Sequence, residues 1–216
     1  MTFSAAFFDM DGLFLDSEPQ WHDSQQEICA RYSYHWDEDD QRICIGGPLS
    51  RVGDYISDIC AHDMSGAQVV EELTQMMLVK LSAKAILMPG AYEAVERVRQ
   101  QMPVALVSAS PRILMDAALT TLPKDFFQFS ISADDVERTK PFPDPYLKAA
   151  ERMGVTPDSC VVFEDSLTGI ASAKSAGCSV VAVPHYVDVA TARKVRVVRS
   201  LSNVSLEFLS EFHAAI

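Results

Sequence analysis

The chain has 216 residues, of which 48% are hydrophobic and 22% charged, with a formal net charge of −12. No stretch approaches about 18 consecutive apolar residues, so no membrane-spanning helix is expected, and the acidic charge argues against nucleic-acid binding, which needs a basic surface. The five cysteines form no CxxC pair, which argues against a zinc site or a disulfide framework. The N-terminal residues lack the basic and apolar regions of a signal peptide, so we expect a cytoplasmic protein.

The first predicted element is a short buried strand, Ala5–Phe8, which stops at the acidic Asp9. From residue 17 to residue 84 the apolar residues recur at helical spacing, and no strand pattern stands out. We therefore expect an all-helical cap of about four helices at residues 17–84. It would be inserted after the first strand of a core domain formed by residues 1–16 and 85–216.

The rest of the chain alternates between helix and strand. In chain order the predicted elements are helix 91–101, strand Val104–Val107, helix 111–122, a weaker strand Phe129–Ser132, helix 144–153, strand Cys160–Phe163, helix 168–176 and strand Val180–Val183. Ser110 and Asp144 each precede a proline, and both are predicted to cap the helices that follow them. This alternation predicts an α/β fold with a doubly wound parallel sheet.

Polar side chains follow three of the predicted strands: Asp9, Ser108 and the pair Glu164-Asp165. Ligands bind at the carboxyl ends of the strands in an open α/β sheet, so we expect these groups to meet there with Lys140 from a loop. A carboxylate that attacks a phosphate dianion at ~4 Å is repelled by ~8 kcal/mol at an effective dielectric of ~20. Magnesium with oxygen ligands, together with a lysine, offsets this repulsion. The set therefore favours phosphoryl transfer to a carboxylate.

Four segments resemble, in family order, the four motifs of the haloacid dehalogenase superfamily. They are Asp9-Met10-Asp11-Gly12-Leu13, Val107-Ser108-Ala109-Ser110, Lys140-Pro141 and Phe163-Glu164-Asp165-Ser166. The helical insert after the first motif resembles the small cap of the β-phosphoglucomutase-like branch. The resemblance covers essentially the whole chain, and within that branch it points to bacterial sugar-phosphate phosphatases.

The resemblance implies roles for the first motif. Asp9 would be the nucleophile that forms an aspartyl-phosphate. Asp11 would protonate the leaving alcohol and then activate water. The dehalogenases of the superfamily lack an acid at that position, so Asp11 also argues against dehalogenation.

The resemblance implies substrate and metal ligands as well. The substrate-binding residues would be Asp9, Met10, Asp11, Ser108, Ala109 and Lys140, of which Ser108 and the N–H of Ala109 would hold the phosphoryl group and Lys140 would neutralise it. Mg²⁺ would be bound by Asp9, the carbonyl oxygen of Asp11 and Asp165, with Glu164 either a direct ligand or a support for one.

Arg51 is a candidate substrate-binding residue in the cap. It follows Gly46 and Gly47, and two glycines suggest a flexible loop that brings Arg51 toward an anionic or hydroxylated substrate. A solvated arginine near the start of a helix fits the same pattern equally well.

The sequence bears on two alternatives to a phosphatase, a sugar phosphomutase and a non-catalytic binding protein. The related sugar phosphomutases carry a histidine ten residues after the acid–base aspartate, where this chain has Trp21, and residues 67–79 contain no lysine or arginine. Both departures favour hydrolysis over phosphomutase activity. A non-catalytic phosphometabolite-binding protein would be expected to lack Asp9, Asp11 or Asp165, and all three are present.

The sequence also limits the class of substrate and the oligomeric state that we expect. A small phosphorylated metabolite is expected, with hexose phosphates and their deoxy analogues first and nucleotides, pseudouridine phosphate and polyol phosphates left open. No long apolar face stands out, so we expect a monomer.

Overall fold

A parallel sheet forms the centre of the computed structural model, which describes residues 3–46 and 48–216. Within those residues the sheet has six strands in the order β3-β2-β1-β4-β5-β6, all parallel. The strands are β1 (Ala5–Phe8), β2 (Val104–Val107), β3 (Ser130–Ile131), β4 (Cys160–Glu164), β5 (Ser179–Ala182) and β6 (Val195–Val197). Strands β2 and β3 lie on one side of β1, and β4, β5 and β6 lie on the other, so the strand order switches at β1. The doubly wound α/β fold is therefore confirmed, and its ligand-binding edge is fixed at the end of β1.

Helices cover both faces of this sheet because neighbouring strand residues point to opposite sides. Phe7 faces α7 (Asp144–Met153) and α8 (Leu167–Ala176), where its ring lies 6.5 Å from that of Tyr146. Phe8 faces α5 (Ala91–Arg99) and α9 (Leu206–Ala214), and its ring stacks on Phe163 at 4.3 Å. Phe7 and Phe8 are fully buried, and burial of each such side chain contributes ~1.5–3 kcal/mol.

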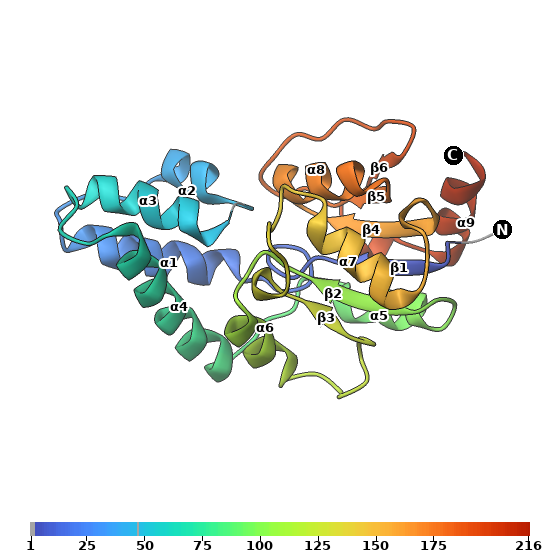
Figure 1. Ribbon diagram of the computed structural model, residues 1–216, viewed down its shortest axis with the longest axis horizontal. Coiled ribbons are helices and arrows are strands. Elements are labelled where there is room, and N and C mark those ends of the chain that lie inside the picture. The colour runs from blue at the N-terminus through green and yellow to red at the C-terminus, as the bar shows by residue number, and fades with distance from the viewer. Residues whose placement is uncertain (1–2, 47) are drawn as a thin grey trace.

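Four helices fill the stretch between β1 and α5, as the apolar spacing predicted. They are α1 (Glu18–Ala30), α2 (Glu38–Cys44), α3 (Leu49–Ile59) and α4 (Gly66–Ala83). Ile28, Ile56 and Leu73 from three of them are fully buried in a shared core. The pair α3 and α4 packs closely, since a Cβ added to Gly53 would lie 2.4 Å from the carbonyl oxygen of Gly66. Figure 1 shows this helical body on the left, beyond the carboxyl ends of the strands, with α4 beside α6 (Arg112–Leu119).

Two predicted helix caps are wrong. Helix α6 has Pro111 at its N-cap, and the hydroxyl of Ser110 turns toward Asp11 instead. Helix α7 begins at Asp144 itself, whose carboxylate accepts two hydrogen bonds of 3.1 Å from Arg138. In each case the side chain bonds to a group outside the helix instead of capping it.

Two elements near the C-terminus were not predicted, β6 and α9. All five cysteines lie among the described residues, and each is a buried free thiol. In the part of the chain that the structure describes, no helix combines the length and apolarity needed to cross a membrane.

Candidate active site

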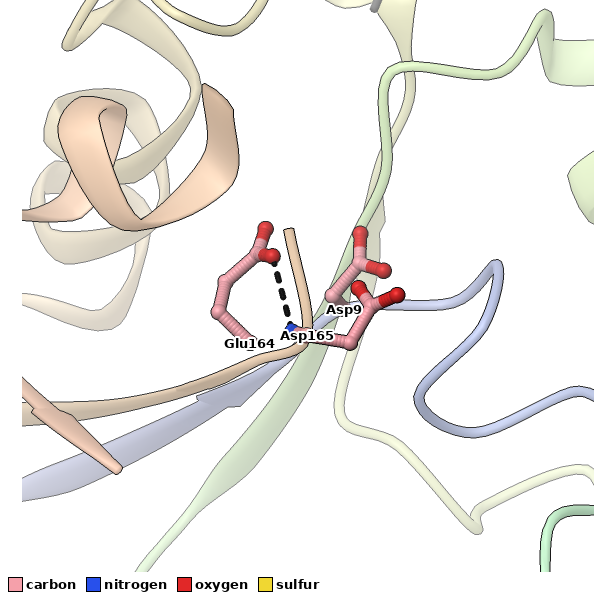
Figure 2. A group of neighbouring side chains, drawn as sticks. All are labelled: Asp9, Glu164 and Asp165. Carbon is pink, nitrogen blue, oxygen red and sulfur yellow. Dashed lines mark hydrogen bonds between the residues drawn. The ribbon is translucent and has the colours of Figure 1, made fainter. Parts of the chain in front are cut away.

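Three carboxylates meet at the ends of two neighbouring strands. Asp9 follows β1, Glu164 ends β4 and Asp165 follows it, and one oxygen of each lies within 4.8 Å of the others. Figure 2 shows the three side chains together at this edge of the sheet. None is more than 6% exposed. The register that pairs Phe8 with Phe163 fixes this arrangement, because it brings the two strand ends level.

Lys140 is buried against this carboxylate group with 2% of its surface exposed. Its ammonium forms an ion pair with Asp9, lies 2.6 Å from Glu164 Oε1 and donates to the carbonyl oxygen of Val107 at 2.9 Å. Burial alone would lower the pKa of Lys140, but the charges of Asp9 and Glu164 outweigh it and raise that pKa above its usual range. The lysine is therefore cationic inside the site rather than solvated.

Glu164 has both oxygens occupied by hydrogen bonds within the protein. Oε1 accepts from Lys140 and, at 2.9 Å, from the hydroxyl of Tyr146. Oε2 accepts from the N–H of Asp165 at 3.1 Å and from the N–H and hydroxyl of Ser166 at 3.2 and 3.0 Å. Of the two roles expected for Glu164, these contacts favour support of the site, since it holds Lys140 and the Asp165 backbone in place.

A glycine on α8 leaves the space that Glu164 fills. A Cβ added to Gly169 would lie 1.7 Å from Glu164 Oε1, which is far inside contact distance. The N–H of Gly169 also donates to Ser166 Oγ at 3.1 Å, which caps α8. Neither feature was predicted, because the sequence shows only a glycine near a helix start.

Asp9 and Asp165 are buried carboxyl groups whose charged forms are not fully compensated by the protein. Burial raises the pKa of both above the usual value of 3.8; Lys140 opposes this at Asp9, whereas Asp9 and Glu164 raise the pKa of Asp165 further. Asp165 Oδ1 is buried and has no hydrogen-bond partner among the described residues. A buried carboxylate oxygen without a partner is costly, and a hard cation with oxygen ligands satisfies it. The donor set therefore fits Mg²⁺.

Gly12 allows Asp165 to approach the first motif. Its φ of +78° suits glycine, and a Cβ there would lie 2.3 Å from Asp165 Oδ2. The predicted motif glycine thus has a steric reason.

Asp11 lies outside the group of three carboxylates and accepts four hydrogen bonds. Ser17 Oγ and Trp21 Nε1 donate to its Oδ1 at 2.8 and 3.3 Å. Ser108 Oγ and Ser110 Oγ donate to its Oδ2 at 3.1 and 2.7 Å. Two donors come from the start of the helical insert and two from the loop after β2, so Asp11 joins the two parts of the molecule. Sequence reasoning missed Ser17 and Ser110 as partners of Asp11.

A cavity opens between the strand ends and the helical insert. Its walls include Asp9, Asp11, Ser108, Ala109, Ser110, Lys140 and Ser166 from the sheet side, and Glu18, Trp21, Gln25, Gln41, Cys44, Ile45, Gly46, Leu49 and Val52 from the insert. Burial, followed by the charge of Asp11, raises the pKa of Glu18 to about 7.

Two other predicted substrate-binding residues, Arg51 and Met10, do not bring their side chains to the cavity. Arg51 is exposed, does not line the cavity, and its guanidinium lies 3.4 Å from the carbonyl oxygen of Ile45. Met10 turns its side chain into the core, so only its backbone remains for the site. Of the two predicted loop glycines, Gly46 lines the cavity and Gly47 lies outside the described residues.

Comparison with known proteins gives a consistent result. Residues 6–183 match the family model described as haloacid dehalogenase-like hydrolase. The fructose-1-phosphate phosphatase YqaB of Escherichia coli K12 is 31% identical over 84% of this chain and 96% of its own length. Hexitol phosphatase B of the same organism is 32% identical over 83% of each chain. A β-phosphoglucomutase structure from Clostridium difficile superposes with a TM-score of 0.83 over 98% of this chain and 97% of its own; at 22% identity this shows a shared fold.

Proposed function

Because the chain belongs to the haloacid dehalogenase-like hydrolase family, we propose that it is a magnesium-dependent phosphatase acting on small sugar phosphates through a phosphorylated Asp9. The buried group of Asp9, Glu164 and Asp165 carries this proposal. The group places three carboxyl side chains beside the single ammonium of Lys140, and one Mg²⁺ ion would supply the two positive charges that balance them in their charged forms. Magnesium held by Asp9, Asp165 and the carbonyl oxygen of Asp11 would reduce the repulsion between Asp9 and a phosphate dianion.

The first half-reaction transfers the phosphoryl group to the protein. A carboxylate oxygen of Asp9 attacks phosphorus while the bond from phosphorus to the leaving alcohol oxygen breaks. Asp11 gives that oxygen its proton. Ser108 and the N–H of Ala109, at the end of β2, bind the oxygens of the phosphoryl group during its transfer, and Lys140 offsets the negative charge of those oxygens.

The second half-reaction restores Asp9. Asp11, now ionised, takes a proton from water, whose oxygen attacks phosphorus and releases inorganic phosphate and the Asp9 carboxylate. Trp21 holds this carboxylate in place, because its indole N–H donates to Asp11 Oδ1 at 3.3 Å. A phosphomutase must instead suppress attack by water, and the histidine that the related phosphomutases carry at this position is replaced by Trp21 in this chain.

The relatives support the substrate class, since the two E. coli proteins are named for fructose 1-phosphate and hexitol phosphates. We further propose that residues 17–84 act as a cap on a core of residues 1–16 and 85–216, and that the protein is a cytoplasmic monomer. The cavity between cap and core, which is lined by both polar and apolar side chains, supports a small metabolite as substrate.

Phosphate release tests the proposal. Fructose 1-phosphate, sorbitol 6-phosphate and β-glucose 1-phosphate would be assayed with and without Mg²⁺, for wild type and Asp9→Asn. We expect metal-dependent release that the variant loses by at least ~10³-fold, since no other group replaces the nucleophile. Asp116→Asn removes the same charge from a carboxylate whose side chain is 62% exposed and should leave turnover unchanged. Full activity in Asp9→Asn, or isomerisation of β-glucose 1-phosphate without release, would contradict the proposal.

A further inference from the structure

The cap wall of the cavity carries a connected set of polar side chains. Trp36 Nε1 donates to Gln41 Oε1 at 3.0 Å, and Gln41 Nε2 donates to Glu18 Oε2 at 3.0 Å. Because an indole N–H cannot accept, Trp36 fixes the Gln41 amide with its NH₂ group toward Glu18. Glu18 Oε2 is thereby held in place on the cavity wall.

Gln25 adds an unsatisfied group to the same wall. The side chain is 3% exposed and lines the cavity, yet its Oε1 has no hydrogen-bond partner among the described residues. A buried amide oxygen without a partner is unfavourable, and a ligand that donates a hydrogen bond removes the penalty. A hydroxyl group both donates and accepts, so it suits Gln25 in either orientation of the amide.

The cavity offers no charge for a second anion. Among the described lining residues the one cationic side chain is Lys140, and it is already engaged with Asp9 and Glu164. Arg51, the cation expected in the cap, lies outside the cavity. Arg42 lines an adjoining hollow that shares Glu18 and Gln41, but its guanidinium is paired with Glu38 and Asp39. A second phosphate or a carboxylate on the leaving group would therefore lie beside Glu18 without an unpaired counter-charge.

Apolar side chains complete the wall. Leu49 and Val52 from α3 lie beside the polar set and suit the C–H faces of a carbon chain. Hydroxyl-binding groups next to apolar surface, with no free cation, match a neutral polyhydroxylated carbon chain.

We propose that Glu18, Gln25 and Gln41 form a hydroxyl-binding wall that selects phosphate monoesters of neutral polyhydroxy compounds and rejects leaving groups that carry a second phosphate or a carboxylate. The inference rests on the proposed phosphatase function. It places specificity on α1 and α2 rather than on Arg51. Glu18, Gln25 and Gln41 bind the leaving group, and the reacting atoms stay with the residues at the strand ends.

Matched substrates test the wall. The kcat/KM of sorbitol 6-phosphate would be compared with those of n-hexyl phosphate, which has the same chain length without hydroxyls, fructose 1,6-bisphosphate and phosphoglycolate. We expect wild type to prefer sorbitol 6-phosphate over each by at least about 100-fold. Gln25→Leu and Glu18→Gln should each lower the ratio of sorbitol 6-phosphate to n-hexyl phosphate by about fivefold to tenfold, the value of one hydrogen bond.

Gln20→Leu is the matched control, because Gln20 lies on the same helix outside the cavity and its Nε2 donates to the carbonyl oxygen of Lys84 at 3.2 Å. It should leave the ratio unchanged, as should Arg51→Ala. Equal kcat/KM values for the four esters in wild type would overturn the hydroxyl-binding wall but leave the proposed phosphatase function standing. This comparison does not depend on any variant folding. An unchanged ratio in both Gln25→Leu and Glu18→Gln would also overturn it. Absence of release from every ester would overturn the proposed function and the inference together.

Discussion

Replacing Lys140 by methionine tests the electrostatic basis of the site, because methionine keeps most of the length and removes the charge. Lys140 is 2% exposed and contacts Asp9, Glu164 and the Val107 carbonyl oxygen. Removing one partner of a buried ion pair costs ~3–5 kcal/mol of unfolding free energy. Catalysis should suffer separately. A unit charge at ~4 Å from the phosphoryl group, at an effective dielectric of ~20, contributes ~4 kcal/mol, and this corresponds to about 10³-fold in kcat.

Two measurements separate these effects. Urea unfolding gives the stability loss, and phosphate release at saturating Mg²⁺ and substrate gives kcat for the folded fraction. Lys124→Met removes an exposed lysine and should change neither quantity by much. A folded Lys140→Met variant whose kcat stays within tenfold of wild type would refute the assigned electrostatic role of Lys140.

Three further predictions address the groups around the site. Gly169→Ala should lower stability by ~1–3 kcal/mol, because its Cβ would lie 1.7 Å from Glu164 Oε1; wild-type unfolding with wild-type kcat would contradict this. The pKa of Glu18 is raised from 4.5 to about 7. The contribution of Glu18 to the unfolding free energy is therefore fully present below pH 4.5 and is lost as pH rises through 7. Between pH 4.5 and pH 8 wild type should therefore lose up to about 3 kcal/mol of unfolding free energy that Glu18→Gln does not lose. Urea unfolding of both proteins at the two pH values measures this, and a difference between the proteins that is the same at both pH values would contradict it. Trp21→Phe keeps the ring but removes the donor to Asp11, so kcat should fall about fivefold to tenfold; a kcat equal to that of wild type would exclude this role.

The predicted strands were most accurate where the sequence is locally unambiguous. Ala5–Phe8 and Val104–Val107 match residue for residue, since each is an unbroken apolar run with a polar residue after it. Val195–Val197 was missed because an arginine separates its two valines and only pairing with β5 makes it a strand. Short edge strands depend on the sheet beside them rather than on their own composition.

The candidate site was predictable where strand ends determine it and unpredictable where distant side chains do. Asp9 and Asp165 meet because β1 and β4 are neighbours. Ser110 has the local pattern of a helix cap, but its hydroxyl donates to a carboxylate 99 residues earlier in the chain. Gln25 and Gln41 meet the substrate cavity only through the packing of α1 and α2, and no short motif records that packing.

The separation of the reactive groups from the cavity wall has an evolutionary consequence. Asp9, Lys140 and Asp165 belong to the sheet side, whereas Gln25 and Gln41 belong to helices α1 and α2 of the insert. Substitutions at Gln25 and Gln41 would leave the contact between Trp21 and Asp11 in place, so on the proposed function related enzymes can change the ester they accept while keeping the same reacting groups. The same feature makes the positions of Gln25 and Gln41, with Trp21 retained, the rational place to randomise when a hydrolase for a different ester is wanted.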